Sequence, residues 1–168
     1  MSMYYVNVFF IFALIGHVIE NFAYTKVDSG ILYGFWTPIY GIGVLAIILI
    51  NNNISKLKLN KWFKPILLFF TCAISLALIE SIAGYFIELV YGRIFWSYYN
   101  HFIPIGKYTS LQMMGIWGFA SLALIYFMMP YIESFIKKTP KVITFLLISA
   151  FIIDLLYTFS KLADFKII

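Results

Sequence analysis

Three glutamates lie in long apolar stretches of the sequence, at Glu20, Glu80 and Glu88. An ionised carboxylate at the centre of a bilayer costs about 3 kcal/mol, so it usually faces protein or trapped water and often belongs to a substrate or proton path. Carboxylates in that setting can bind a polar substrate or transfer a proton. The sequence therefore predicts a polar site that these glutamates form inside a bundle of helices.

Glu80 and Glu88 share one face of their predicted helix. At about 100° per residue, Ala73, Ala77 and Gly84 fall with them in an arc of about 80°. Small residues allow helices to approach closely in lipid, so we expect this face to pack into the bundle. The two glutamates are about 12 Å apart along the helix axis, which is too far for them to share a proton. Their spacing suits a relay or a two-point polar site.

Glu20 lies near the end of the first apolar stretch, with Gly16 one turn before it. His17 can pair with Glu20 on the helix surface, since residues three apart are neighbours there. Two alternatives remain open. Glu20 and Glu88 lie near helix ends and can simply reach interfacial water, and Glu80 can make a structural hydrogen bond to another helix.

The sequence lacks the short motifs of several enzyme classes. It contains no Gly-x-x-x-x-Gly-Lys-Ser/Thr loop for ATP hydrolysis, no His-Glu-x-x-His, no Cys-x-x-Cys and no Gly-x-Ser-x-Gly. The 2 histidines and the single cysteine, Cys72, leave little for a transition-metal site. We therefore predict no metal and no cofactor, and any catalysis would use carboxylate, tyrosine or histidine side chains.

The composition indicates that membrane-spanning helices hold these glutamates. Hydrophobic residues make up 63% of the chain and charged residues 11%, against about 25% charged residues in a soluble domain. A helix needs about 20 apolar residues to cross the hydrocarbon core. The predicted fold is all-α, a polytopic transmembrane bundle of about five helices that forms a single domain over residues 1–168. The predicted spans are residues 5–22, 33–50, 65–90, 111–132 and 142–160.

Asp154 interrupts the last predicted span. This aspartate can pair with Lys161, two turns later, or can mark a helix that does not cross the membrane fully. The sequence leaves both alternatives open.

Lysines cluster in the connections that follow the second and fourth spans. These lysines are Lys56, Lys58, Lys61, Lys64, Lys137, Lys138 and Lys141. Because basic connections stay in the cytoplasm, we predict a multi-pass protein of the cell membrane with a cytoplasmic N-terminus. Glu20 and Glu88 then lie near the outer interface with Glu80 deeper, so the predicted site opens to the outside. The net charge of +5 thus indicates a lipid bilayer as partner and no nucleic acid.

Aromatic residues flank the predicted site. Trp96, Tyr98 and Tyr99 precede the fourth span and can form either an interfacial belt or the mouth of a cavity. The candidate substrate-binding residues are Glu20, Glu80, Glu88, Tyr33, Tyr40, Trp96 and Tyr98.

Glycines and a proline mark the start of the second span. Gly30 and Gly34 permit a tight turn before it. Pro38 lacks an N–H and can free a carbonyl near Gly34, although an ordinary helix start with proline in the first turn is the alternative. The predicted turn and packing residues are Gly16, Gly30, Gly34, Pro38, Gly41 and Gly84.

Several of these residues stand in motifs that resemble those of a known family. Residues 16–20 resemble its Gly-x-x-Ile-Glu, and residues 30–41 resemble its Gly-x-Leu-Tyr-Gly-Pro-x-x-Pro-Ile-Tyr-Gly. Residues 80–98 resemble a stretch that ends in Trp-Asp-Tyr, with serine here at the acidic position. Gly106 and the pair Trp117–Gly118 resemble the remaining motif. The family is the bacterial "putative ABC transporter permease" family, also called ABC-transporter type IV or CmpB-like, which includes the transmembrane protein 229 group.

This resemblance implies a permease component of a transporter, which works with a separate ATPase subunit or as a homo-oligomer. Two other functions stay open from the residues themselves. One is an intramembrane enzyme that acts on a lipid or isoprenoid, with Glu80 or Glu88 as acid or base. The other is a structural or regulatory membrane protein without turnover.

Overall fold

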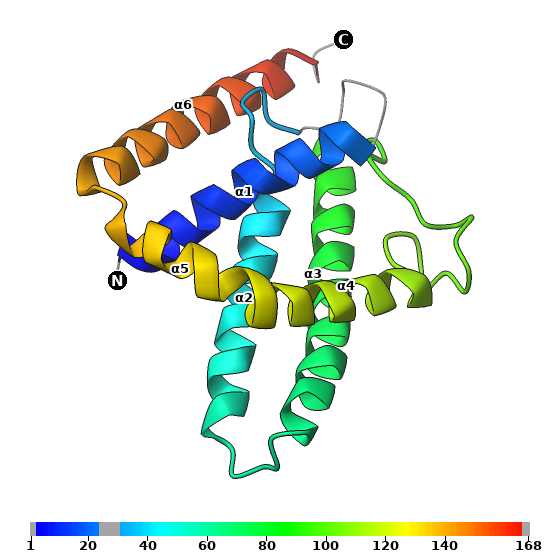
Figure 1. Ribbon diagram of the computed structural model, residues 1–168. Helices are drawn as coiled ribbons and strands as arrows, with labels where there is room; N and C mark the ends of the chain where they lie inside the picture. The colour runs from blue at the N-terminus through cyan, green and yellow to red at the C-terminus, as the bar shows by residue number, and fades with distance from the viewer. Residues whose placement is uncertain (1–2, 24–30, 166–168) are drawn as a thin grey trace. The chain divides into compact units, whose positions relative to one another are not determined.

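The computed structural model describes residues 3–23 and 31–165, with side chains described for residues 3–22 and 31–161. Its helices, labelled in Figure 1, are α1 (Met3–Ala23), α2 (Pro38–Lys56), α3 (Phe63–Tyr91), α4 (Leu111–Ala123), the π-helical turn η1 (Leu124–Met128), α5 (Met129–Lys138) and α6 (Lys141–Phe165). Because α4, η1 and α5 are continuous, the described part of the chain has 5 helical stretches that are long and apolar enough to cross a membrane. The predicted all-α fold is confirmed.

The start of the second helix differs from the predicted span for a local reason. Helix α2 begins at Pro38 rather than at residue 33, and Pro38 is its first residue. Proline is favoured there because the first N–H groups of a helix have no intrahelical partner. The Gly34 carbonyl accepts a hydrogen bond from the Trp36 N–H at 2.8 Å. The idea that Pro38 frees this carbonyl is therefore wrong, and the helix start is an ordinary one.

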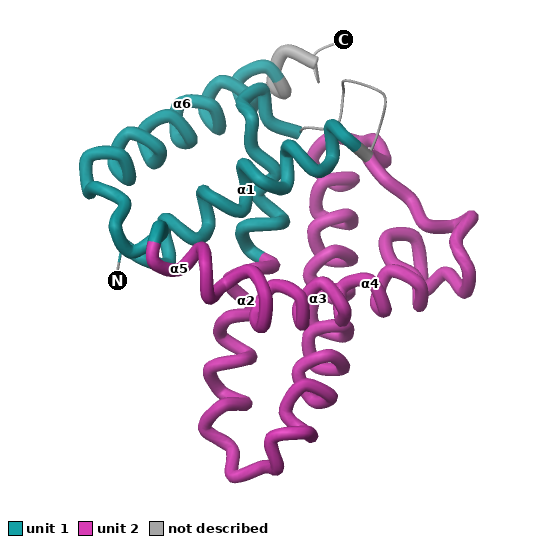
Figure 2. Tube along the Cα trace, viewed as in Figure 1, with its two compact units in different colours: residues 1–42, 135–168 teal, residues 43–134 magenta. Residues whose placement is uncertain are grey.

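The chain divides into two compact units, coloured separately in Figure 2. Unit 1 comprises residues 1–42 and 135–168, and unit 2 comprises residues 43–134. The single transmembrane domain expected from the sequence stays a prediction.

Unit 2 is built on α3, the longest helix, with 29 residues. Residues 43–56 of α2 and the start of α3 form a hairpin, which the Lys64 ammonium closes by donating to the Ser55 carbonyl at 2.8 Å. Helix α4 crosses α3 (Figure 1). Its Gly118 lies against the ring of Phe69, where a Cβ would come within 2.6 Å of that ring. Small residues thus let two apolar helices approach closely.

The fourth stretch contains one wide turn. The Met129 N–H donates to the Leu124 carbonyl, five residues back, instead of the usual four. Pro130 follows at once. A proline ring clashes with the carbonyl four residues before it, so a wider turn just ahead of Pro130 relieves that clash.

Unit 1 joins α1 and α6, which lie side by side (Figure 1). A buried polar link ties their ends, since the Thr144 hydroxyl donates to Asn7 Oδ1 at 2.7 Å and Asn7 Nδ2 donates to the Ile136 carbonyl at 3.4 Å. Helix α6 continues through Asp154 without a break. Asp154 Oδ2 accepts a hydrogen bond from the Gly34 N–H at 3.0 Å. The polar groups in both places, buried at Asn7 and half-buried at Asp154, are therefore paired.

The connection between α3 and α4 packs onto α3 through a glycine. Tyr108 is buried with 1% of its surface exposed. A Cβ on Gly84 would lie 2.8 Å from Tyr108 Cδ2 and closer still to other atoms of that ring. Because Gly84 has no side chain, the Tyr108 ring can pack directly against the backbone of α3.

We expect Gly84→Ala to lower the stability of the folded protein by about 1–3 kcal/mol, because the added methyl overpacks against the buried Tyr108 ring. The matched control is Gly115→Ala in α4, since a Cβ there meets nothing within 4 Å. Both changes add the same methyl to a helix, so their difference isolates the steric contact. Thermal unfolding of the detergent-solubilised protein measures this, and equal unfolding midpoints for the two variants would contradict it.

Candidate functional site

Glu80 lies at the centre of a hydrogen-bonded cluster in unit 2. Its side chain projects from α3 and is 5% exposed. Glu80 Oε1 accepts a hydrogen bond from the Tyr98 hydroxyl at 2.8 Å, and Oε2 accepts one from Trp117 Nε1 at 3.1 Å. Tyr98 belongs to the connection between α3 and α4, and Trp117 belongs to α4. The carboxylate therefore joins three separate parts of unit 2.

The partners of Glu80 are neutral. Within the described residues, no lysine, arginine or histidine nitrogen comes within 4.0 Å of its carboxylate. Thr109 lies beside the same carboxylate, and its hydroxyl, buried with 4% exposure of the residue, makes no hydrogen bond shorter than 3.5 Å. A carboxylate has about four acceptor positions, and two are taken. Glu80 thus keeps unused capacity to accept hydrogen bonds or to bind a cation.

Glu88 forms a second, charged cluster two turns further along α3. Lys107 Nζ lies 2.7 Å from Glu88 Oε1 and 2.9 Å from Oε2, and the Tyr108 hydroxyl donates to Oε2 at 2.7 Å. The side chains of Lys107 and Glu88 are 24% and 30% exposed. The ion pair therefore lies toward the surface of unit 2, whereas Glu80 is buried.

The two groups that bind Glu88, Lys107 and Tyr108, both have raised pKa values. The hydrogen bond to Glu88 raises the pKa of the Lys107 ammonium above its ordinary value. Burial, followed by the hydrogen bond to Glu88, raises the pKa of Tyr108 to about 12. Both groups keep their protons throughout the neutral range, so both remain hydrogen-bond donors to Glu88.

The connection that carries these donors is itself folded. Tyr98 N–H donates to the Lys107 carbonyl at 3.0 Å, and Ile105 N–H donates to the Thr109 carbonyl at 2.9 Å. Ser110 caps α4 by accepting a hydrogen bond from the Met113 N–H at 3.2 Å. These bonds hold Tyr98 and Lys107 next to each other, so one connection supplies donors to both glutamates.

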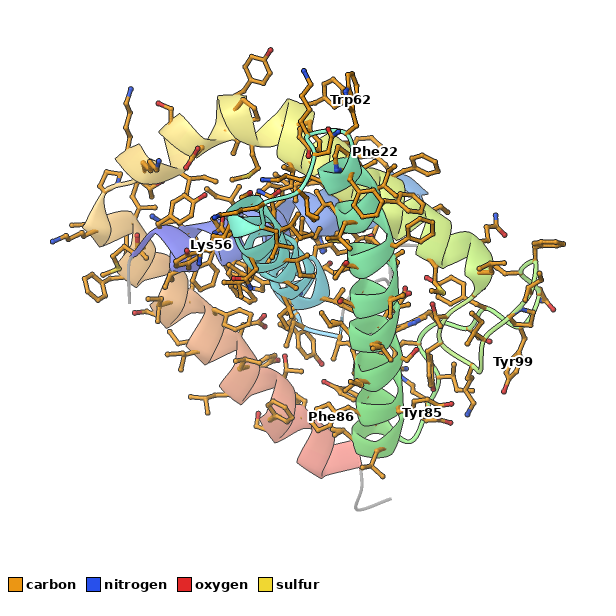
Figure 3. All side chains as sticks on the ribbon, turned by 90° about the horizontal axis from the view of Figure 1, so that it is seen from below. Phe22, Lys56, Trp62, Tyr85, Phe86 and Tyr99 are labelled. Atoms are coloured by element: carbon orange, nitrogen blue, oxygen red, sulfur yellow. The ribbon has the colours of Figure 1, made fainter. Side chains whose placement is uncertain are left out.

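The aromatic residues of this connection face different ways. Tyr98 points inward to Glu80, and the Trp96 ring packs on Tyr108 with ring centroids 5.7 Å apart. Tyr99 is 60% exposed and projects away from α3 (Figure 3). Trp96 and Tyr98, both half-buried, therefore turn toward unit 2, and Tyr99 alone of the three has the orientation expected of an interfacial belt.

Glu20 lies in unit 1 with different partners from those expected. Its Oε2 accepts a hydrogen bond from the Thr37 hydroxyl at 3.3 Å. His17 does not pair with it. Instead, the His17 ring meets the Phe35 ring edge-on at 5.4 Å, and its buried Nδ1 has no partner. The pairing of His17 with Glu20 predicted from helical spacing is wrong, because Thr37 before α2 comes closer than a neighbour on the same helix.

The other candidates in unit 1 have packing contacts. Tyr40 lies on Gly16, where a Cβ would come within 2.6 Å of Tyr40 Cβ. Tyr33 is exposed and meets Tyr157 edge-on at 4.9 Å. Gly30 lies outside the described residues. A site that combines Glu20 with Glu80 stays a prediction, because these residues belong to different units.

Sequence reasoning missed three residues of the clusters, Lys107, Tyr108 and Trp117. Lys107 and Tyr108 lie 19 and 20 residues from Glu88, and Trp117 lies 37 residues from Glu80. No helical or strand periodicity relates residues at such separations. The one available signal was the Trp117–Gly118 motif, which marked the tryptophan without giving its partner.

Within the described residues, no group of three or more His, Cys, Asp and Glu side chains could hold a metal ion. The groups that contact the Glu80 carboxylate are hydroxyl and indole groups. A carboxylate with such partners can bind a cationic or hydrogen-bond-donating molecule or carry a proton.

Comparison with known proteins adds one finding. A model of the family described as "Putative ABC-transporter type IV" matches residues 7–159. The match includes both glutamates of α3, the connection after it and Trp117. No match was found among curated proteins or among solved structures.

We expect the Lys107 ammonium to stabilise the folded protein at neutral pH and to lose this effect only at high pH. Since its pKa is raised in the folded protein, the ammonium stabilises the fold fully below its ordinary pKa of 10.5, and this effect is lost as the pH rises through the raised value. The difference in unfolding temperature between wild type and Lys107→Met should stay constant from about pH 7 to about pH 9 and then shrink.

The control for that comparison is Lys58→Met, an exposed lysine of the hairpin between α2 and α3. It should unfold like wild type at each pH. A difference between wild type and Lys107→Met that already falls below about pH 9 would contradict the raised pKa of the lysine.

Proposed function

Since this chain belongs to the family described as "Putative ABC-transporter type IV", we propose that it is the membrane-embedded permease component of a transporter. The family predicted from the sequence motifs is confirmed over residues 7–159. The 5 apolar helices fit a multi-pass membrane protein. Family membership is the observation that carries the proposal, and the cell membrane, with the N-terminus in the cytoplasm, is the proposed setting.

The proposed substrate-site residue is Glu80. Support comes from its burial, its neutral partners and its unused acceptor positions. An intramembrane carboxylate with no nearby cation is suited to a substrate that supplies a positive charge or hydrogen-bond donors. The lysine-rich connections, assigned to the cytoplasm, put the Glu88 end of α3 toward the outside, so the site opens outward in this proposal.

The energy source is proposed to be a partner. The sequence contains no phosphate-binding loop for ATP, so a separate ATPase subunit would supply hydrolysis. One chain with 5 spans is small for a translocation pathway. We propose that further copies of this chain, or the partner subunits, complete the pathway.

Native mass spectrometry of the protein, extracted gently from its own membrane, tests this proposal. We expect an ATPase subunit bound to wild type and to Glu80→Gln alike, because a buried side chain is not part of a docking surface. We expect a small molecule bound to wild type to be absent from Glu80→Gln. Glu133→Gln, a carboxylate of α5 outside both clusters, is the matched control and should keep both.

Two outcomes would contradict the proposal in different ways. A lipid that is lost only from Glu80→Gln, without an ATPase subunit in any sample, would contradict the permease proposal. It would favour an intramembrane enzyme or a lipid-binding protein. An ATPase subunit in all samples, with identical small molecules in wild type and Glu80→Gln, would support the permease proposal. It would contradict the proposal that Glu80 binds the substrate.

A further inference from the structure

The connection between α3 and α4, residues 92–110, covers Glu80 and is attached to α3 at two levels. At the deeper level Tyr98 donates to Glu80 at 2.8 Å. At the outer level Lys107 and Tyr108 donate to Glu88, each at 2.7 Å. We call residues 92–107 the strap and the ion pair between Lys107 and Glu88 the latch. Tyr108, buried against Gly84, lies beyond the strap and anchors the end of the connection on α3. Two attachments about 12 Å apart along one helix hold the strap flat against α3.

The two levels differ in chemistry. The latch is an ion pair whose side chains are 24% and 30% exposed, so water and salt reach it. The deeper contact is a hydrogen bond between a buried carboxylate and a neutral hydroxyl. The latch can therefore exchange its partners for water at small cost, whereas Glu80 needs a replacement donor when Tyr98 leaves.

The strap also has glycines where its backbone turns. Gly92, the residue directly after α3, has φ 67° and a Cβ there would meet nothing within 4 Å. Gly106, next to Lys107, has φ 69°. These left-handed conformations favour glycine, and residues at the ends of helices commonly absorb the rotation when a segment moves. Open space around Gly92 leaves room for such a rotation.

Thr109 adds an observation at the deeper level. Its hydroxyl is buried beside the Glu80 carboxylate as a weak partner, outside the geometry of a good hydrogen bond. A molecule that takes the position of the Tyr98 hydroxyl can therefore contact both the carboxylate and this hydroxyl.

We propose that the strap is a gate over Glu80, which opens by rotation about Gly92 after the latch releases. Opening withdraws the Tyr98 hydroxyl from Glu80 and gives a hydrogen-bond-donating or cationic group access to the carboxylate and to Thr109. The closed state is the arrangement seen in the structure. This gate rests on the proposed function only in assigning Glu80 to the substrate, since the movement of the strap can be measured without transport.

The test uses thiol labelling of the full-length protein in membranes, in a background with Cys72→Ala. Thr109→Cys places a reporter beside Glu80, under the strap. We expect Lys107→Met to increase the labelling rate of this cysteine by about two- to fivefold, the range for loss of a partly exposed ion pair. Lys107→Arg, which keeps the charge, should label at nearly the wild-type rate, and so should Lys58→Met.

A second reporter distinguishes gate opening from unfolding. Ser121 in α4 is fully buried, and its hydroxyl donates to the Trp117 carbonyl of its own helix. Ser121→Cys should stay unlabelled in Lys107→Met if the strap alone moves. Labelling of both reporters would mean that unit 2 unfolds, and an unchanged rate at Thr109→Cys would mean that the latch holds no gate. Either result overturns the proposal, and neither depends on finding an ATPase partner.

Discussion

The folding of unit 2 depends on one constraint, the need to provide hydrogen-bond donors for a carboxylate inside an apolar bundle. Glu80 is 5% exposed on a helix whose neighbours are almost all apolar. A buried polar group without partners costs free energy comparable to several hydrogen bonds. Tyr98 and Trp117 meet that need from two other elements. The carboxylate thus orders both the connection and α4 around α3, which apolar packing, being non-directional, would not do by itself.

A second constraint, the room for aromatic rings, recurs in both units. Tyr108 lies on Gly84 in unit 2, and Tyr40 lies on Gly16 in unit 1. In both places a glycine in a helix leaves space for a tyrosine ring from another segment to approach the helix backbone. Tyr108 also donates to Glu88, so its position combines packing with a directional bond. Helices in lipid gain little from hydrophobic burial against one another, and close contact of this kind is an alternative source of specificity.

The two glutamates of α3 have different roles in the proposed transporter. Glu88 already has a cation, and its ion pair with Lys107 attaches the strap. Glu80 has neutral donors only and retains acceptor capacity. A transporter needs a site that binds its substrate without binding it permanently. A carboxylate whose present partner is a tyrosine hydroxyl meets that need, because a stronger donor can replace the hydroxyl and the hydroxyl can return afterwards.

The sequence by itself determined the membrane-spanning helices, because their length and apolar composition follow from the thickness of the bilayer. It also determined the face of α3 with Ala73, Ala77, Glu80 and Gly84, all buried in the structure, because helical periodicity acts over a few residues. Only the tertiary structure decided which groups bind the glutamates. Tyr98, Lys107 and Trp117 lie 18 to 37 residues away from them. Thr37, rather than His17, binds Glu20, since partners brought together by packing have no regular spacing along the chain.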